Sequence, residues 1–151
     1  MAALEEVTVT TTVPLDFPYN YRVGQYLEKY IQGLGDKKIL GVRCPDCGKV
    51  LVPPRKVCGT CVGLEEWVEV GQEGTVENYT VAHVKLEKGL IEKLEAPRLL
   101  AMITLDGASV PLLAEVRGIE APDLKKGLRV RAVFKDPPEG SLSDLDHFEP
   151  V

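Results

Sequence analysis

The sequence predicts a mainly β protein with an N-terminal helix, in which a small cysteine-rich module precedes a five-stranded barrel. Three observations support this fold class. One amphipathic stretch lies near the N-terminus, all four cysteines fall within 18 residues, and β-prone stretches separated by turn residues fill most of the remaining chain. With 151 residues, of which 44% are apolar and 27% charged, the chain can bury a real core.

Composition also excludes several classes of protein. No apolar run approaches the roughly 20 residues that a membrane span requires, and the acidic start at Glu5 and Glu6 is followed by no signal-peptide core. We therefore expect a cytoplasmic protein that does not meet a membrane. A net charge of -5 disfavours general binding to nucleic acid, which requires a surplus of lysine and arginine.

The N-terminal part is expected to be an extended arm followed by a helix. Residues 7–13 are β-prone but end at Pro14. From Asn20 the apolar residues recur at the i, i+3, i+4, i+7 spacing of an amphipathic helix, and Gly35 ends the pattern. The apolar positions are Val23, Tyr26, Leu27, Tyr30, Ile31 and Leu34.

The cysteines form two pairs, Cys44–Cys47 and Cys58–Cys61, each with the spacing Cys-x-x-Cys. Two such loops together supply four thiolates to a tetrahedral zinc ion. A site of four cysteines is closed to water and substrate, so the pattern predicts one structural zinc ion in a zinc ribbon.

Three alternatives to zinc stay open at this point. Iron suits the same ligands, a disulfide is disfavoured because nothing indicates secretion, and a redox role for one pair would leave the second unexplained. Gly48 and Gly63, each just beyond a pair, fit the positive φ that such turns often need.

Five β-like stretches follow the cysteines and predict a small, partly open barrel of the OB type, although an SH3-like barrel fits the same pattern. A helical turn is expected at residues 121–124. The predicted strands are Glu66–Val70, Thr75–Val84, Leu99–Leu105, Val110–Val116 and Leu128–Phe134.

Two further segments lie outside the predicted strands. Residues 85–97 are longer than a hairpin turn requires and carry leucine and isoleucine at roughly helical spacing, which predicts a short helix. This helix would either plug one end of the barrel or form a lip against a ligand or partner. Residues 136–151 contain three prolines and five acidic residues and are predicted to be a solvated tail.

The expected parts are an arm and helix over 1–35, the zinc ribbon over 36–65, the barrel over 66–135 and the acidic tail over 136–151.

Positive charge is concentrated around the cysteines. Residues 37–56 hold six cations and one acid, so the rest of the chain carries -10. Such a cluster attracts anions such as phosphates, or it offsets the -2 charge of a zinc ion with four thiolates. The cations are Lys37, Lys38, Arg43, Lys49, Arg55 and Lys56.

The chain contains no other convincing catalytic or ligand-binding pattern. Neither His83 nor His147 has neighbours at metal-ligand or triad spacing, and phosphate-loop and nucleophile-elbow patterns are missing. We therefore predict no catalytic residue.

Six short segments occur in a fixed order: GVRCPDCG at 41–48, PPR at 53–55, WVEV at 67–70, GTVENYTV at 74–81, AP at 96–97 and LKKGLRV at 124–130. With these segments, residues 20–135 resemble a family in which a rubredoxin-like zinc ribbon is joined to an OB-fold and which is associated with acyl-CoA enzymes. The resemblance implies a small accessory protein that binds or channels a coenzyme A thioester while a thiolase-type partner supplies the chemistry. Charge alone would then place the CoA phosphates near Arg43, Lys49, Arg55 and Lys56.

Two other functions are weighed against this one. Zinc ribbons and OB barrels also serve as single-stranded nucleic-acid modules, but four of the five tyrosines cluster at residues 19–30 rather than in the barrel strands. An independent hydrolase acting through His83 is the third hypothesis. Thiolase chemistry itself would need cysteine thiols, and all four are assigned to the predicted metal site.

Overall fold

The structure, a computed structural model, describes residues 21–59, 61–87 and 89–151, so the predicted arm at residues 7–13 lies outside it. The predicted N-terminal helix is confirmed as α1 (Gly24–Gly35), whose Tyr30 and Leu34 are buried. After Gly35 the chain leaves the helix, and the Asp36 N–H still donates to carbonyls of the last turn. No helix among the described residues is both long and apolar enough to cross a membrane.

The zinc-ribbon part consists of two small antiparallel sheets. One is three-stranded in the order β2-β1-β5, with β1 (Ile39–Arg43) between β2 (Val50–Leu51) and β5 (Glu66–Val70). The other is the hairpin of β3 (Val57–Cys58) and β4 (Cys61–Val62). The sequence placed residues 66–70 in the barrel, which is wrong, because β5 pairs along its whole length with β1.

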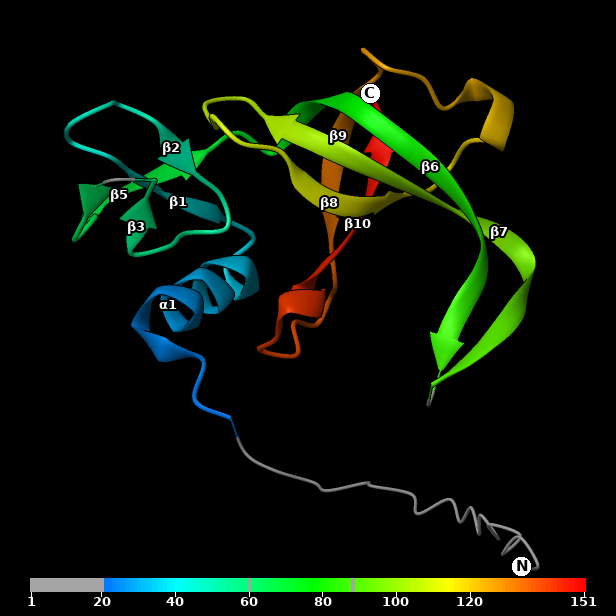
Figure 1. Cartoon of the computed structure of the whole chain (residues 1–151), viewed down its shortest axis with the longest axis horizontal. Coiled ribbons are helices and arrows are strands. Elements are labelled where there is room, and N and C mark those ends of the chain that lie inside the picture. The colour runs from blue at the N-terminus through cyan, green and yellow to red at the C-terminus, as the bar shows by residue number, and fades with distance from the viewer. Residues whose placement is uncertain (1–20, 60, 88) are drawn as a thin grey trace, which may run out of the picture.

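Five strands form a closed barrel in the order β10-β8-β7-β6-β9, which confirms the predicted five-stranded OB-type fold (Figure 1). Alternate residues of β7 from Leu99 to Leu105 are buried, as expected for a strand with one face on a core. The predicted turn at 121–124 is a short 3-10 helix, η1 (Ala121–Asp123). The barrel strands are β6 (Glu73–Glu87), β7 (Leu90–Leu105), β8 (Leu112–Val116), β9 (Arg129–Phe134) and β10 (Leu145–Pro150).

The solvated tail predicted for residues 136–151 is wrong over its second half. A 3-10 helix, η2 (Leu142–Asp144), leads into β10, which pairs parallel with β8 and antiparallel with β9 and so closes the barrel. Phe148 is fully buried. The acidic residues of β10 are paired with arginines, Asp146 with Arg117 at 3.0 Å and Glu149 with Arg131 at 3.8 Å.

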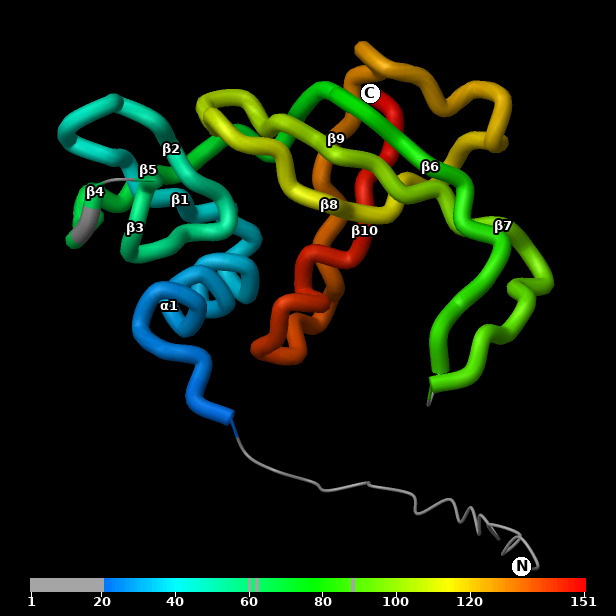
Figure 2. Tube along the Cα trace, in the orientation of Figure 1, coloured from blue at the N-terminus to red at the C-terminus, as the bar shows by residue number. Residues whose placement is uncertain are grey.

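The helix predicted within residues 85–97 is also wrong. The strands β6 and β7 continue beyond the barrel and pair as far as Glu87 and Leu90, forming a two-stranded extension that projects from the barrel (Figure 2). Its apolar residues do not plug the barrel, because all of them between positions 84 and 91 are exposed.

One apolar core runs through both parts of the molecule. Buried residues of α1, the zinc ribbon and the barrel belong to the same cluster, so the two parts pack as one body. Members from the helix and ribbon are Tyr30, Leu34, Ile39, Val50, Val52 and Val70, and members from the barrel include Val76, Ile103, Leu105, Val130 and Phe148.

Candidate functional site

The first cysteine loop begins where β1 ends. The Cys44 N–H donates to the Lys49 carbonyl at 2.8 Å, and the Gly48 N–H donates to the Cys44 carbonyl at 2.9 Å. These bonds close a tight turn that carries Cys44 and Cys47. Gly48 has φ of +70°, so the predicted positive φ is confirmed, and a side chain there would be strained.

The second loop is the tip of the β3–β4 hairpin, in which Cys58 and Cys61 are paired across the strands. Behind the loop the Gly63 N–H donates to the Lys56 carbonyl at 3.0 Å. Gly63 has φ of +73°, which confirms the second glycine prediction.

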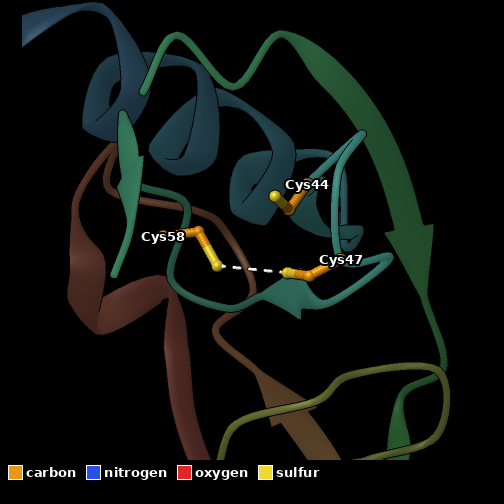
Figure 3. Close-up of side chains that lie close together, drawn as sticks. All are labelled: Cys44, Cys47 and Cys58. Carbon is orange, nitrogen blue, oxygen red and sulfur yellow. Dashed lines mark hydrogen bonds between the residues drawn. The ribbon is translucent and has the colours of Figure 1, made fainter. Parts of the chain in front are cut away.

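The structure brings the cysteines of the two loops together (Figure 3). The sulfurs of Cys44, Cys47 and Cys58 all lie within 4.8 Å of one another, and the Cys47 and Cys58 sulfurs are 3.5 Å apart. Cys61 joins the group through Cys44, since its sulfur lies within 4.8 Å of the Cys44 sulfur and of an Asp46 oxygen. A tetrahedral zinc ion with Zn–S bonds of about 2.3 Å sets its sulfurs about 3.8 Å apart, close to the Cys47–Cys58 distance.

The thiols of this cluster have displaced pKa values. Backbone hydrogen bonding, chiefly from Cys47, lowers the pKa of Cys44 to about 7. The neighbouring thiol of Cys47, with burial and the thiol of Cys44, raises the pKa of Cys58 to about 11. The Cys44 thiol therefore ionises easily, whereas the neighbouring sulfurs oppose ionisation of the Cys58 thiol. A divalent cation would offset the repulsion between such thiolates.

The donor set fits a structural metal better than the alternatives. A sulfur separation of 3.5 Å is far longer than the roughly 2.05 Å of a disulfide, and none of the four cysteines is in one. Cys44 is fully buried and packs with Val42, Leu51 and Leu64. Four thiolates in tetrahedral array suit zinc or iron, and such a site holds the loops together without an open position for chemistry.

Helix α1 is fastened to the ribbon beside this site by an aromatic stack that sequence analysis missed. The Tyr26 and Trp67 rings are stacked with centroids 5.6 Å apart, and the Lys29 ammonium lies 4.3 Å from the Trp67 ring centroid. The Tyr26 hydroxyl donates to the Leu64 carbonyl at 2.6 Å. The helical spacing placed Tyr26 on the apolar face, but no local pattern indicates that its partner is Trp67, which lies 41 positions further along the chain.

The six cations predicted to form an anion site fall into two groups. Lys37, Lys38 and Arg43 are paired with Asp136, Glu69 and Glu66 at 3.3, 3.7 and 3.0 Å, so three of the six cations are neutralised. Lys49, Arg55 and Lys56 are exposed and have no ion pair within residues 21–59, 61–87 and 89–151. They lie immediately after the first cysteine loop and before the second, at the border of the metal site.

The two histidines are in different settings. His83 is exposed on β6. His147 is half-buried on β10, where its Nδ1 and Nε2 lie 2.9 and 3.3 Å from carboxylate oxygens of Asp146 and Glu149.

A cleft of about 650 Å³ lies at the junction of the helix, the ribbon and the barrel. It is lined by Tyr30 of α1, Pro53 of the ribbon and the outer surface of β7 and β8, including Leu100 and Leu113. Burial raises the pKa of Tyr30 to about 12. Sequence analysis missed this cleft because its walls come from segments far apart in the chain.

A four-cysteine ribbon fused to an OB barrel defines the class of this protein, and comparisons with known proteins agree. Residues 32–65 match the family model described as the rubredoxin-like zinc ribbon domain of ChsH2, and residues 67–135 match its C-terminal OB-fold domain. The chain is 30% identical over 118 residues to a "DUF35 domain-containing scaffold protein" of Methanocaldococcus jannaschii, covering 75% of this chain and 82% of that protein. The chain belongs to this DUF35 family, so the resemblance found in the sequence is confirmed.

Two solved structures share the fold. A DUF35 protein of unknown function from Sulfolobus solfataricus is 30% identical, with a TM-score of 0.59 over 73% of this chain and 78% of that one. A chain of the structure titled "Ltp2-ChsH2(DUF35) aldolase" has a TM-score of 0.62 over 87% of this chain and 98% of its own, with 22% identity. The OB-fold family model matched over residues 67–135 favours an OB-type rather than an SH3-like barrel.

Proposed function

We propose that this protein is a non-catalytic accessory subunit of a thiolase-type acyl-CoA enzyme, in which it binds or channels the coenzyme A thioester. The observation that carries the proposal is the joining of a closed four-cysteine site to an OB barrel in a family whose curated relative is named a scaffold protein. Every cysteine of the chain lies in that site, so the nucleophilic thiols of thiolase chemistry would come from the partner.

One structural zinc ion, bound by Cys44, Cys47, Cys58 and Cys61, is part of this proposal. It would join the turn after β1 to the β3–β4 hairpin. The low pKa of the Cys44 thiol supports metal binding at neutral pH, because a metal ligand must be deprotonated.

The phosphates of coenzyme A are proposed to bind at the cations that border the metal site. Lys49, Arg55 and Lys56 support this best, because they are exposed and lack ion pairs among the described residues, whereas Arg43 also pairs with Glu66 at 3.0 Å. A group of exposed cations raises the local concentration of a polyanionic ligand.

The identity of the acyl group is the most specific part of what we propose. In size and layout the chain resembles the small zinc subunit of benzoylsuccinyl-CoA thiolase, an enzyme of anaerobic toluene degradation. Benzoylsuccinyl-CoA is therefore the first thioester to test with the assembled complex.

The proposal is tested by native mass spectrometry of the tagged chain purified from its source cells. We expect one zinc ion per chain and a second, thiolase-sized chain that can be identified by its peptides. The complex should cleave an acyl-CoA with free coenzyme A, and this chain alone should not.

Two results would contradict the proposed function. Turnover of an acyl-CoA by the isolated chain would make it an enzyme, and loss of that turnover in His83→Ala would implicate the exposed histidine. Salt-sensitive binding of single-stranded oligonucleotides, with no acyl-CoA enzyme recovered, would favour the nucleic-acid alternative.

A further inference from the structure

The extension of β6 and β7 beyond the barrel carries apolar side chains that are not buried in the core. In this hairpin arm (residues 84–93) every described residue is exposed, and Val84, Leu86 and Ile91 are 53, 76 and 76% exposed. The arm projects from the barrel in Figure 2. A two-stranded hairpin is only marginally stable in water, so an arm that exposes such residues is typical of a binding element.

The strand register sorts the arm into an apolar and a charged face. Val84 pairs with Lys93 and Leu86 pairs with Ile91, and directly paired residues share a face of an antiparallel sheet. The opposite face carries Lys85, which bonds to the Glu87 carboxylate and to Glu92 at 3.1 Å. The charged face is therefore internally satisfied, and the apolar face is left without a partner among the described residues.

The outer face of the barrel continues the same apolar character. Met102 pairs with Leu113 and Leu100 pairs with Glu115, so these side chains share the outer face of β7 and β8. Leu113 is 65% exposed. Two hollows meet here, since both the 650 Å³ cleft and a depression of about 200 Å³ over β6–β8 are lined by Leu100 and Leu113.

The strand β6 connects the two apolar regions. Thr80 pairs with Leu100 on the outer face, and Ala82, Val84 and Leu86 follow at two-residue steps on the same side of β6. The strand pairing is irregular between Ala82 and Val84. The additional unpaired residues at this point belong to β7, between Lys93 and Arg98. We define the arm–barrel surface as Val84, Leu86, Ile91, Leu100, Met102 and Leu113.

The border of the arm–barrel surface is richer in cations than the chain as a whole. Arg98 and Arg117 share the single carboxylate of Glu115, at 3.0 and 2.8 Å, and Arg117 also reaches Asp146 at 3.0 Å. Lys93 stands on the apolar face of the arm. The charged residues that line the cleft, Arg98, Arg117 and Lys135 against Glu115 and Asp146, sum to +1, on a chain of net charge -5.

We propose that the arm–barrel surface is the docking site for the catalytic subunit, which would present an apolar area bordered by acidic residues. This inference rests on the proposed function. The cationic border complements such a partner, whereas a second copy would set the same cations against each other across a two-fold axis.

The test uses the complex recovered from source cells and three single variants of the full chain. Ile91→Asp changes the apolar face of the arm and Leu113→Asp the barrel region. Leu90→Asp is the matched control, because Leu90 is 67% exposed on the same turn of the arm but lies on the charged face. All three residues are exposed, so the variants should fold, which circular dichroism and zinc content check.

Affinity for the purified catalytic subunit is measured by calorimetry. We expect Ile91→Asp and Leu113→Asp to weaken binding about 30-fold or more, as for central interface residues, and Leu90→Asp to change it less than about 3-fold. Hydrogen exchange should show protection of residues 84–93 and 100–102 in the complex.

The outcomes separate the two proposals. Equal affinity of all variants for an acyl-CoA enzyme would overturn the docking site and leave the proposed function intact. Loss of a partner that is not an acyl-CoA enzyme, in Ile91→Asp but not Leu90→Asp, would support the docking site and overturn the proposed function. If the wild-type chain self-associates and Ile91→Asp abolishes this, a second copy of the chain occupies the surface. If deletion of residues 1–20 removes hydrogen-exchange protection from the arm, the N-terminal segment occupies it. Either result would overturn the proposed docking site.

Discussion

Phe148 gives the sharpest test of how the barrel is closed. The residue lies on β10, within the segment whose composition predicts a solvated tail, yet its ring is fully buried and belongs to the main core. It pairs with Val116 of β8 on one side and Ala132 of β9 on the other. Replacing Phe148 by Ala should therefore open a cavity where the two ends of the sheet meet.

The expected loss of stability follows from burial. Full burial of a phenylalanine side chain contributes about 3 kcal/mol by transfer from water, and an unrelaxed cavity adds about 1 kcal/mol, for a total of about 4 kcal/mol. With an m-value of about 2 kcal/mol/M, the urea midpoint should fall by about 2 M. If Phe148→Ala does not fold, Phe148→Leu should retain the fold and lose about 1 kcal/mol.

Urea unfolding of the metal-loaded protein, followed by Trp67 fluorescence and by circular dichroism, provides the measurement. Leu142→Ala is the control, because Leu142 is half exposed in η2 and should cost less than about 0.5 kcal/mol. A loss below about 1 kcal/mol in Phe148→Ala would refute closure of the barrel by β10, since a solvated tail predicts no change.

Three further results are expected. Removal of metal by a chelator after thiol modification should release one zinc ion per chain, read by a colorimetric indicator, and should lower the melting temperature. Gly74→Ala should destabilise the fold more than Gly127→Ala in urea titrations, because a Cβ at Gly74 would lie 2.7 Å from the Thr104 carbonyl, whereas Gly127 has φ of +86° in open space and should cost about 1 kcal/mol. Backbone N–H groups of Glu139, Ser141 and Gly140 lower the pKa of Asp144 below its ordinary 3.8, so its contribution to stability is present above that pH and is lost as pH falls through the lower folded-state pKa. Thermal unfolding between pH 5 and pH 2.5 should show a weaker decline in Asp144→Asn.

The helix and the metal site could be predicted because their signals are local. The spacing of Tyr26, Tyr30 and Leu34 reports one buried helix face, and two Cys-x-x-Cys pairs report a shared ligand set whatever the fold around them. The glycines beyond the pairs follow from the same local geometry.

The errors arise where distant segments decide the structure. Strand β5 has the alternation expected of a barrel strand, and only its register with β1 assigns it to the ribbon. Strand β10 carries a single fully buried side chain, Phe148, and its acidic residues look solvated until their arginine partners are known. Composition alone therefore argued for a tail.

The hairpin arm shows a third kind of failure. Leucine and isoleucine at three- and four-residue intervals predict a helix when the residues are assumed to face one core. In the arm these residues lie on both faces of an exposed pair of strands. Leu90 is on one face, and Leu86 and Ile91 are on the other. The periodicity was thus a coincidence of spacing.

The continuous core has a consequence for how the protein is matured. Two family models divide the chain after residue 65, but Ile39, Val50 and Val70 of the ribbon share one apolar cluster with Val76 and Phe148 of the barrel. Ribbon and barrel should therefore melt in a single cooperative transition, and a chain that has not acquired its metal would also lack a fully formed barrel. Metal delivery would in this way control the folding of both halves of the chain, because neither half would be complete without it.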